Sequence, residues 1–188
     1  LYEKWYMSYD DELKSNNYST PKRCANALKK YLTDSNSHIL DIGCGTGLSG
    51  QEILNVGFNN VDGTDFSDKM LYEAKNKNIY KRLFNLDLNR NFYNINFSYN
   101  AIVAAGIISP HHANPSCLEK CLNILCDSGL LIFSLNDHAV ENKNFMDEIF
   151  MIVDKNFEIL EKTYGDHLPG IKLNSFVYVI KKLKIKKY

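Results

Sequence analysis

The sequence predicts a three-layer, doubly wound α/β fold: a mostly parallel seven-stranded sheet with helices on both faces and its last strand antiparallel. First, apolar segments of strand length alternate with segments of helical spacing as far as residue 136. Second, residues 99–105 and 130–136 are apolar almost throughout, as expected for strands covered on both faces. Third, residues 157–164 and 175–183 read as two strands with no helix between them, so they should pair antiparallel.

The first half of the chain supplies three of the expected strands. Residues 1–20 are rich in aromatic and polar side chains, which predicts a short helix and loop outside the main core. A helix should start at Thr20, with Thr20 as its cap and Pro21 as its first helical residue. After it we expect a strand at 38–42, a helix at 48–56, a strand at 60–64, a helix capped by Ser67 and a strand at 81–85.

The second half completes the sheet. A polar loop at 89–96 precedes the strand at 99–105, a helix at 115–126, the strand at 130–136, a helix at 142–155 and the two final strands. No internal repeat or linker is visible, so we expect a single domain over 1–188. Within it, residues 21–188 form the core and residues 1–20 an aromatic cap.

The composition indicates an ordinary globular protein. Of 188 residues 45% are hydrophobic, and 22 Lys and Arg balance 22 Asp and Glu, so no overall field favours nucleic acid or an anionic membrane. The five cysteines include no Cys-x-x-Cys pair, no apolar run reaches membrane-spanning length, and the first residues do not resemble a signal peptide. We therefore expect a cytoplasmic protein without a membrane or nucleic-acid partner.

A glycine-dense stretch, residues 39–50, marks the candidate ligand site. It reads as a short strand, an acidic residue and a glycine turn that opens a helix, which lets a nucleotide-like ligand approach the backbone. Two registers fit. Residues 45–50 satisfy the dinucleotide pattern G-x-G-x-x-G with Asp65 about twenty residues on, whereas Asp41 followed by Gly43, Gly45 and Gly47 forms an acid with three alternating glycines.

The second register resembles motif I of the class I S-adenosylmethionine-dependent methyltransferases, which have a Rossmann-like fold. In a dinucleotide-binding protein the Asp41 carboxylate would face an anionic pyrophosphate, whereas S-adenosylmethionine carries an ammonium group. Asp87-Leu88 matches the family position that holds the adenine amine, and the final helix and two strands match the family's sheet with one reversed strand. We therefore expect an enzyme that uses S-adenosylmethionine and releases S-adenosylhomocysteine (SAH). A non-catalytic sensor or partner subunit that binds S-adenosylmethionine is the alternative, and an NAD-dependent oxidoreductase a remote one.

The resemblance implies the cofactor site. The three glycines admit the methionine half of the cofactor, Asp41 organises the loop and the ammonium group, and the two oxygens of Asp65 suit the ribose hydroxyls. Phe66 and Met70 would pack on adenine. The complete expected set is Asp41, Gly43, Cys44, Gly45, Gly47, Leu48, Asp65, Phe66, Met70, Asp87, Leu88, Ala105, Tyr9 and Tyr18.

The acceptor side should follow the strand at 99–105. The absence of Asn-Pro-Pro-Tyr there argues against methylation of adenine, cytosine or glutamine amides. The order Gly-x-x-x-x-x-His-Ala at 106–113, with the tyrosine-rich start of the chain, is similar to the Williams–Beuren-region-type methyltransferases and suggests a small-molecule acceptor.

Two histidines and two tyrosines have competing interpretations. His112 is the first candidate for a base or substrate contact and His111 the second; both could instead be exposed loop residues. Adjacent histidines point apart and have only remote carboxylates, so we expect no metal site. Tyr9 and Tyr18 either close over the cofactor as a lid or form the apolar face of a docked helix.

Overall fold

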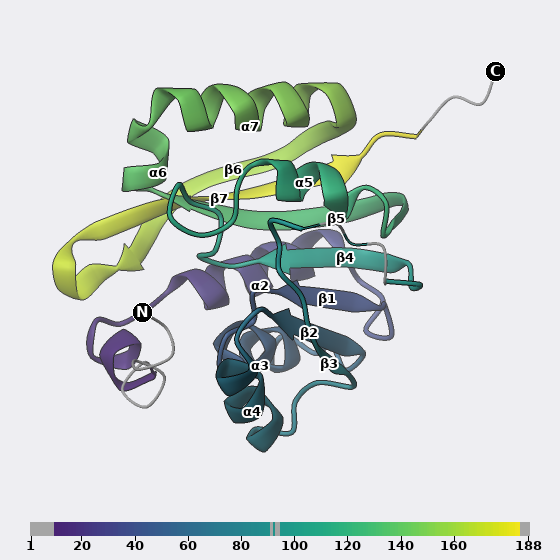
Figure 1. Cartoon of the computed structure of the whole chain (residues 1–188), viewed down its shortest axis with the longest axis vertical. Coiled ribbons are helices and arrows are strands. Elements are labelled where there is room, and N and C mark those ends of the chain that lie inside the picture. The colour runs from purple at the N-terminus through teal and green to yellow at the C-terminus, as the bar shows by residue number, and fades with distance from the viewer. Residues whose placement is uncertain (1–9, 91, 93–94, 185–188) are drawn as a thin grey trace.

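The sheet has the predicted architecture. The computed structural model describes residues 10–90, 92 and 95–184. Seven strands form one sheet in the order β3-β2-β1-β4-β5-β7-β6 (Figure 1). They are β1 (Ile39–Ile42), β2 (Val61–Asp65), β3 (Leu83–Asn85), β4 (Tyr99–Ala104), β5 (Leu125–Asn136), β6 (Phe157–Leu168) and β7 (Leu173–Lys182). Neighbouring strands are parallel except where β7 pairs with β5 and β6, which confirms the predicted reversed strand.

Helices cover both faces of the sheet. They are α2 (Thr20–Tyr31), α3 (Leu48–Asn55), α4 (Asp68–Asn76), α5 (Ser116–Cys121), α6 (Asp137–Glu141) and α7 (Lys143–Asn156), with a 3-10 turn η1 (Pro169–Ile171). Figure 1 shows α2, α3 and α4 on one side of the sheet and α5, α6 and α7 on the other. No helix in the part of the chain that the structure describes is long and apolar enough to cross a membrane.

Two apolar cores form because successive strand residues point to opposite faces. In β5, Leu130 and Ile132 pack with α2 and α3, whereas Leu131 and Phe133 pack with α5 and α7. A strand that serves two cores needs apolar residues at most of its positions, on both faces. This explains why residues 130–136 are apolar except at Ser134 and Asn136.

Two boundaries near β5 differ from the prediction. The helix expected at 115–126 ends at Cys121, and the strand expected at 130–136 begins at Leu125. Leu125 pairs with Tyr99 and Leu130 with Ala101, so an irregularity over residues 126–129 continues the strand through what reads as a turn. The short helix α6 was not predicted; the Asn136 side chain caps it by accepting from the Ala139 N–H at 3.0 Å.

The start of α2 corrects another expectation. The N-cap is Ser19, not Thr20, and no side chain caps the helix. The hydroxyl of Thr20 is instead buried and lies 2.7 Å from Nδ1 of His167, at the end of β6. Burial first, with nearby Arg23 second, lowers the pKa of His167 to about 4, so its ring is neutral near pH 7. The sequence-local cap is therefore replaced by a contact between segments far apart in the chain.

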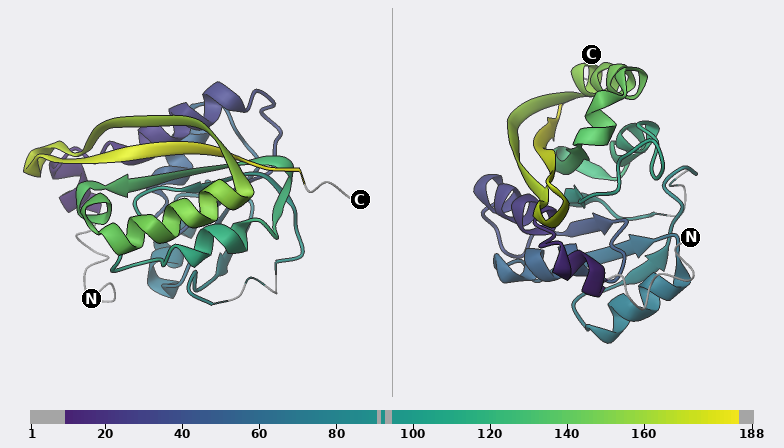
Figure 2. Two further views of the ribbon diagram at one scale, coloured as in Figure 1. Left: turned by 90° about the horizontal axis from the view of Figure 1, so that it is seen from above. Right: turned by 90° about the vertical axis from the view of Figure 1, so that its left-hand side faces the viewer.

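Residues 10–19, which we call the N-terminal strap, run from the β6–β7 hairpin to the glycine turn. Residues 10–15 are helical. At one end Gly170 N–H donates to Asn16 O (3.2 Å) and Ser19 N–H to His167 O (3.0 Å). At the other end Asp10 accepts from the Thr46 hydroxyl and pairs with Lys77 Nζ at 2.6 Å. Figure 2 shows this segment beside the hairpin, which projects past the other strands.

Candidate active site

A cavity of ≈ 340 Å³ opens at the carboxyl ends of the central strands. Here β1 lies between β2 and β4, the point where the strand order reverses and open α/β sheets bind ligands. The lining residues come from the strap and the start of α2, the β1–α3 turn and the start of α3, the end of β2 and the start of α4, and the loops after β3 and β4. They are Tyr18, Pro21, Gly43, Cys44, Gly45, Thr46, Leu48, Ser49, Asp65, Phe66, Met70, Leu86, Asp87, Leu88, Asn89, Ala105, Gly106, Ile107, His111, His112 and Ala113.

The glycine turn has a backbone that other residues rarely adopt. Gly43, Gly45 and Gly47 have φ values of 64°, 53° and 96°, all in the left-handed region. Gly43 and Gly45, two of the residues expected to bind the cofactor, line the cavity. Gly47 does not, because it is the N-cap of α3 and serves the start of that helix.

Asp41 lies beneath the turn rather than in the cavity wall. Its side chain is fully buried at the end of β1, and its Oδ2 accepts from the hydroxyls of Ser49 (2.5 Å) and Tyr80 (2.6 Å). Burial raises the pKa of Asp41 to about 6, although both donors oppose the rise. Asp41 was expected both to organise the loop and to hold the ammonium group of the cofactor. Its hydrogen bonds lie within the loop region, and its side chain does not line the cavity.

Asp65 ends β2 at the cavity wall. Its Oδ2 accepts from Gly45 N–H and its Oδ1 from Ser67 N–H, both at 2.9 Å. Burial raises its pKa above the ordinary value. Phe66 and Met70, expected to pack on adenine, line the same side; Met70 is buried, whereas 59% of Phe66 is exposed. An aromatic ring exposed in a cavity wall offers a surface on which a flat ligand can stack.

The loop after β3 supplies Asp87 and Leu88, both predicted, together with Leu86. One oxygen of Asp87 accepts from Asn89 N–H at 2.9 Å, and the other lies 3.3 Å from Nε of Arg90. The carboxylate therefore lies at a partly exposed edge of the cavity.

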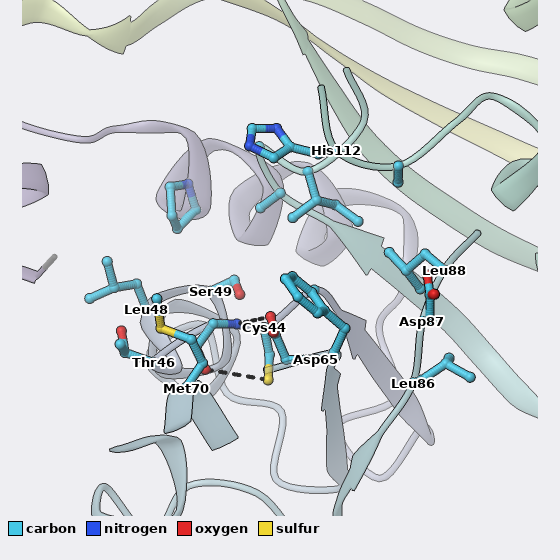
Figure 3. Close-up of a pocket in the computed structure, with 18 of the residues that line it drawn as sticks. Cys44, Thr46, Leu48, Ser49, Asp65, Met70, Leu86, Asp87, Leu88 and His112 are labelled. Atoms are coloured by element: carbon cyan, nitrogen blue, oxygen red, sulfur yellow. Dashed lines mark hydrogen bonds between the residues drawn. The ribbon is translucent and has the colours of Figure 1, made fainter. Parts of the chain in front are cut away.

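His111 and His112 line the opposite side of the cavity. Figure 3 shows His112 on one side and Cys44, Asp65 and Met70 on the other. His112 Nδ1 lies 2.8 Å from the Ser109 hydroxyl, and His112 O accepts from Asn89 Nδ2 at 3.1 Å. Partial desolvation, with a smaller effect of His111, lowers the pKa of His112, so the ring is neutral near pH 7.

Tyr18 brings the strap into the cavity. Its hydroxyl donates to Ala105 O at 3.5 Å, and its ring meets His167 edge-on at 5.2 Å between centroids. A Cβ at Gly106, where φ is 74°, would lie 2.1 Å from the Tyr18 hydroxyl oxygen, so this close approach requires glycine. Tyr9, the other residue expected in the lid, lies outside the described residues.

Eight lining residues were not predicted: Pro21, Thr46, Ser49, Leu86, Asn89, Gly106, Ile107 and Ala113. Thr46 and Ser49 lie inside the glycine stretch and Gly106 directly after the strand at 99–105, so adjacency could have indicated all three. Asn89 joins two loops, since it also accepts from Asn114 N–H at 3.0 Å. No local pattern could indicate such a contact.

Comparison with known proteins bears on the family. Residues 39–129 match the family model described as a methyltransferase domain. Over 85 residues the chain is 33% identical to human methyltransferase-like protein 27, a stretch that covers 44% of this chain and 35% of that protein. The matched stretch thus spans about a third of this relative's length.

Solved structures with the same fold include several methyltransferases. A putative methyltransferase in complex with the Haloferax volcanii Trm112 activator gives a TM-score of 0.74 at 13% identity, covering 100% of this chain and 98% of that one. Synechocystis magnesium protoporphyrin IX methyltransferase with bound SAH gives a TM-score of 0.68 at 15% identity, covering 92% of this chain and 86% of that one. A TehB-like methyltransferase from Corynebacterium glutamicum gives a TM-score of 0.67 at 18% identity, covering 97% of this chain and 98% of that one. Residues 39–129 thus match a methyltransferase domain, and the described chain has the fold of these solved methyltransferases.

Proposed function

We propose that the chain binds S-adenosylmethionine and transfers a methyl group to a small-molecule acceptor. One observation carries the proposal: a single cavity holds the glycine turn and the Asp65 carboxylate on one side and the His111–His112 loop on the other. When bound, S-adenosylmethionine supplies a methyl group on a positively charged sulfur. The chain's own residues then have to hold the cofactor, align the acceptor and keep water out.

The residues on the glycine-turn side suit this cofactor. The oxygens of Asp65 accept backbone N–H groups, among them those of Gly45 and Ser67, and a carboxylate has about four lone-pair sites in all with which it can also accept from a ribose hydroxyl. Phe66 offers its exposed ring to adenine, and Asp87 an acceptor for the adenine amine. The Gly43–Gly45 backbone leaves room for the methionine end.

The same side argues against a dinucleotide. Among the described residues that line the cavity there is no Lys or Arg, whereas Asp65 and Asp87 are both present. Asp41 adds a third carboxyl group beneath the turn. A pyrophosphate here would meet negative charge without a cationic partner, so we place the NAD-dependent alternative last.

The acceptor side favours transfer over binding alone. The cavity continues past the glycine turn to Tyr18, His111 and His112, which leaves polar groups for a second ligand. We assign His112 as the base: its Nδ1 lies 2.8 Å from the Ser109 hydroxyl, and in the tautomer with the proton on Nδ1 the Nε2 atom takes the proton that the acceptor loses and later returns it to water. A protein that only sensed the cofactor would have no use for this part of the cavity.

Calorimetric titration with S-adenosylmethionine, SAH and NAD tests the cofactor. We expect the two sulfur compounds to bind and NAD not to bind. Asp65→Ala should weaken SAH binding at least about tenfold, because the ribose hydroxyls lose their acceptor. Asp154→Ala, an exposed change on α7, should bind as the wild type does. Binding of NAD in place of SAH would overturn the proposal.

The N-terminal strap should control the dissociation of the cofactor. Asp10→Ala removes the contacts with Thr46 and Lys77 that fix the strap to the glycine turn. We expect SAH to dissociate several-fold faster, while the free energy of unfolding changes by less than about 1 kcal/mol because the ion pair is partly exposed. Stopped-flow displacement measures the rate, with Asp11→Ala as the control. Equal rates in all three proteins would exclude this role.

A further inference from the structure

Tyr80 occupies a slot beneath the glycine turn, although it does not line the cavity. It lies in the loop between α4 and β3. A Cβ at Gly50 would lie 2.3 Å from its hydroxyl oxygen, and a Cβ at Gly63 would lie 2.9 Å from its ring. Two glycines, one in α3 and one in β2, thus make room for this one side chain.

The hydroxyl of Tyr80 holds the buried carboxylate of Asp41. It donates to Oδ2 at 2.6 Å, and Ser49 donates to the same oxygen at 2.5 Å. Oδ1 of Asp41 is buried and has no hydrogen-bond partner among the described residues. Burial first, and the nearby Asp41 second, raise the pKa of Tyr80 well above its ordinary value, so the phenol remains a donor.

We propose that Tyr80 is a positioning residue for the methionine end of the cofactor: its hydroxyl keeps Asp41 oriented and ionised beneath the glycine turn. This inference rests on the proposed function. Two donors on Oδ2 fix the rotation of the carboxylate and leave Oδ1 as the remaining acceptor. The negative charge then stabilises the ammonium group of a ligand held above the turn.

Loss of the Tyr80 hydroxyl should change the pKa of Asp41 in a defined direction. A carboxylate that loses a donor binds its proton more tightly, so the pKa of Asp41 rises above about 6 and its charge near pH 7 falls. The other titratable groups that act on Asp41 are Asp65, Cys24 and Cys44. Burial raises the pKa of both thiols, so they stay neutral and cannot replace the lost charge.

The test compares two ligands. SAH carries the amino-acid end, whereas 5′-methylthioadenosine shares the adenosine and the thioether but lacks the ammonium and carboxylate groups. In calorimetric titrations Tyr80→Phe, which keeps the ring in its slot, should bind SAH about tenfold more weakly and 5′-methylthioadenosine with unchanged affinity. Unchanged SAH binding, or equal weakening of both ligands, would overturn the proposal.

Tyr99→Phe is the matched control. The Tyr99 hydroxyl is also buried and donates to a buried carboxylate, Asp62 Oδ2 at 3.0 Å, but at the other end of the strands. Its loss should lower stability and leave the binding of both ligands unchanged. If the two Tyr→Phe variants affect SAH equally, Tyr80 has only a structural role.

A double-mutant cycle gives a second readout. In an Asp41→Asn background, Tyr80→Phe should cause no further loss of SAH affinity, because the charge it supports is absent. Additive losses would contradict coupling through Asp41. If wild-type protein binds neither ligand, the proposed function itself fails; if it binds both and Tyr80→Phe changes neither, only this inference fails.

Discussion

Replacing Gly43 with alanine is expected to lower the free energy of unfolding by about 2–5 kcal/mol and to weaken cofactor binding. Gly43 has φ of 64°, which an alanine adopts only at a cost. The added Cβ would lie 2.6 Å from Cγ2 of Ile107, a contact that forces Ile107 to move. Because Ile107 lines the cavity, its displacement disturbs the site as well as the fold.

Gly57→Ala separates the cost of the left-handed backbone from the cost of the contact with Ile107. Gly57 also has a left-handed backbone, with φ of 98°, but a Cβ there would meet only Lys29 Nζ at 4.0 Å. This variant should lose about 1–2 kcal/mol and bind SAH normally. Urea unfolding and calorimetric titration measure both quantities. Equal stability losses in the two variants would show that the contact with Ile107 is relieved without cost.

Asp41→Asn is expected to gain stability relative to the wild type as the pH rises from acid to neutral. The pKa of Asp41 is about 6 in the folded protein against an ordinary 3.8, a gap worth about 3 kcal/mol. Because the folded pKa is the higher one, the folded state binds the proton of Asp41 more tightly than the unfolded state does. The stability that this proton contributes is fully present below pH 3.8 and is lost as the pH rises through 6. The stability of the variant relative to the wild type should therefore increase by about 2 kcal/mol from about pH 4 to about pH 7.

Asp62→Asn should behave in the opposite way. Burial alone would raise the pKa of Asp62, but hydrogen bonds from Arg82, His38 and Tyr99 outweigh it, and the pKa is lowered. Its contribution to stability is present above the ordinary pKa and is lost as pH falls through the folded value. Urea titrations across this range should show the Asp62→Asn penalty shrinking towards acid. A parallel pH response in the two variants would contradict both assignments.

Much of the fold could be predicted because its signals are local. The two-core packing of β5 favours apolar residues at nearly every position of 130–136, so a strand there could be predicted from the sequence. The predicted N-cap Ser67 is confirmed: its hydroxyl accepts from Met70 N–H at 3.4 Å. Among the site residues, Gly43, Gly45 and Asp65 were predictable because a positive φ and the end of a buried strand restrict which residues can occupy these positions.

The contacts between distant segments could not be predicted. Thr20 reads as a cap, yet its hydroxyl lies against His167, 147 positions away in the chain. Asn89 reads as a loop residue, yet it joins the loop after β3 to the His112 loop. In both cases a short polar side chain has several possible partners, and the packing of the whole molecule selects one.

The sequence by itself determined the succession of the seven strands, most of the helices, the glycines of the β1–α3 turn and the acidic residues near the ends of β1 and β2. Each of these follows from backbone conformation or from burial, which constrain residue type at the position itself. Only the tertiary structure decided that Asp41 lies beneath the turn, that Tyr80 supports it and that the strap reaches Thr46. Such contacts depend on how the helices and strands pack. The residues that take part are far apart in the chain, so no local sequence pattern can predict them.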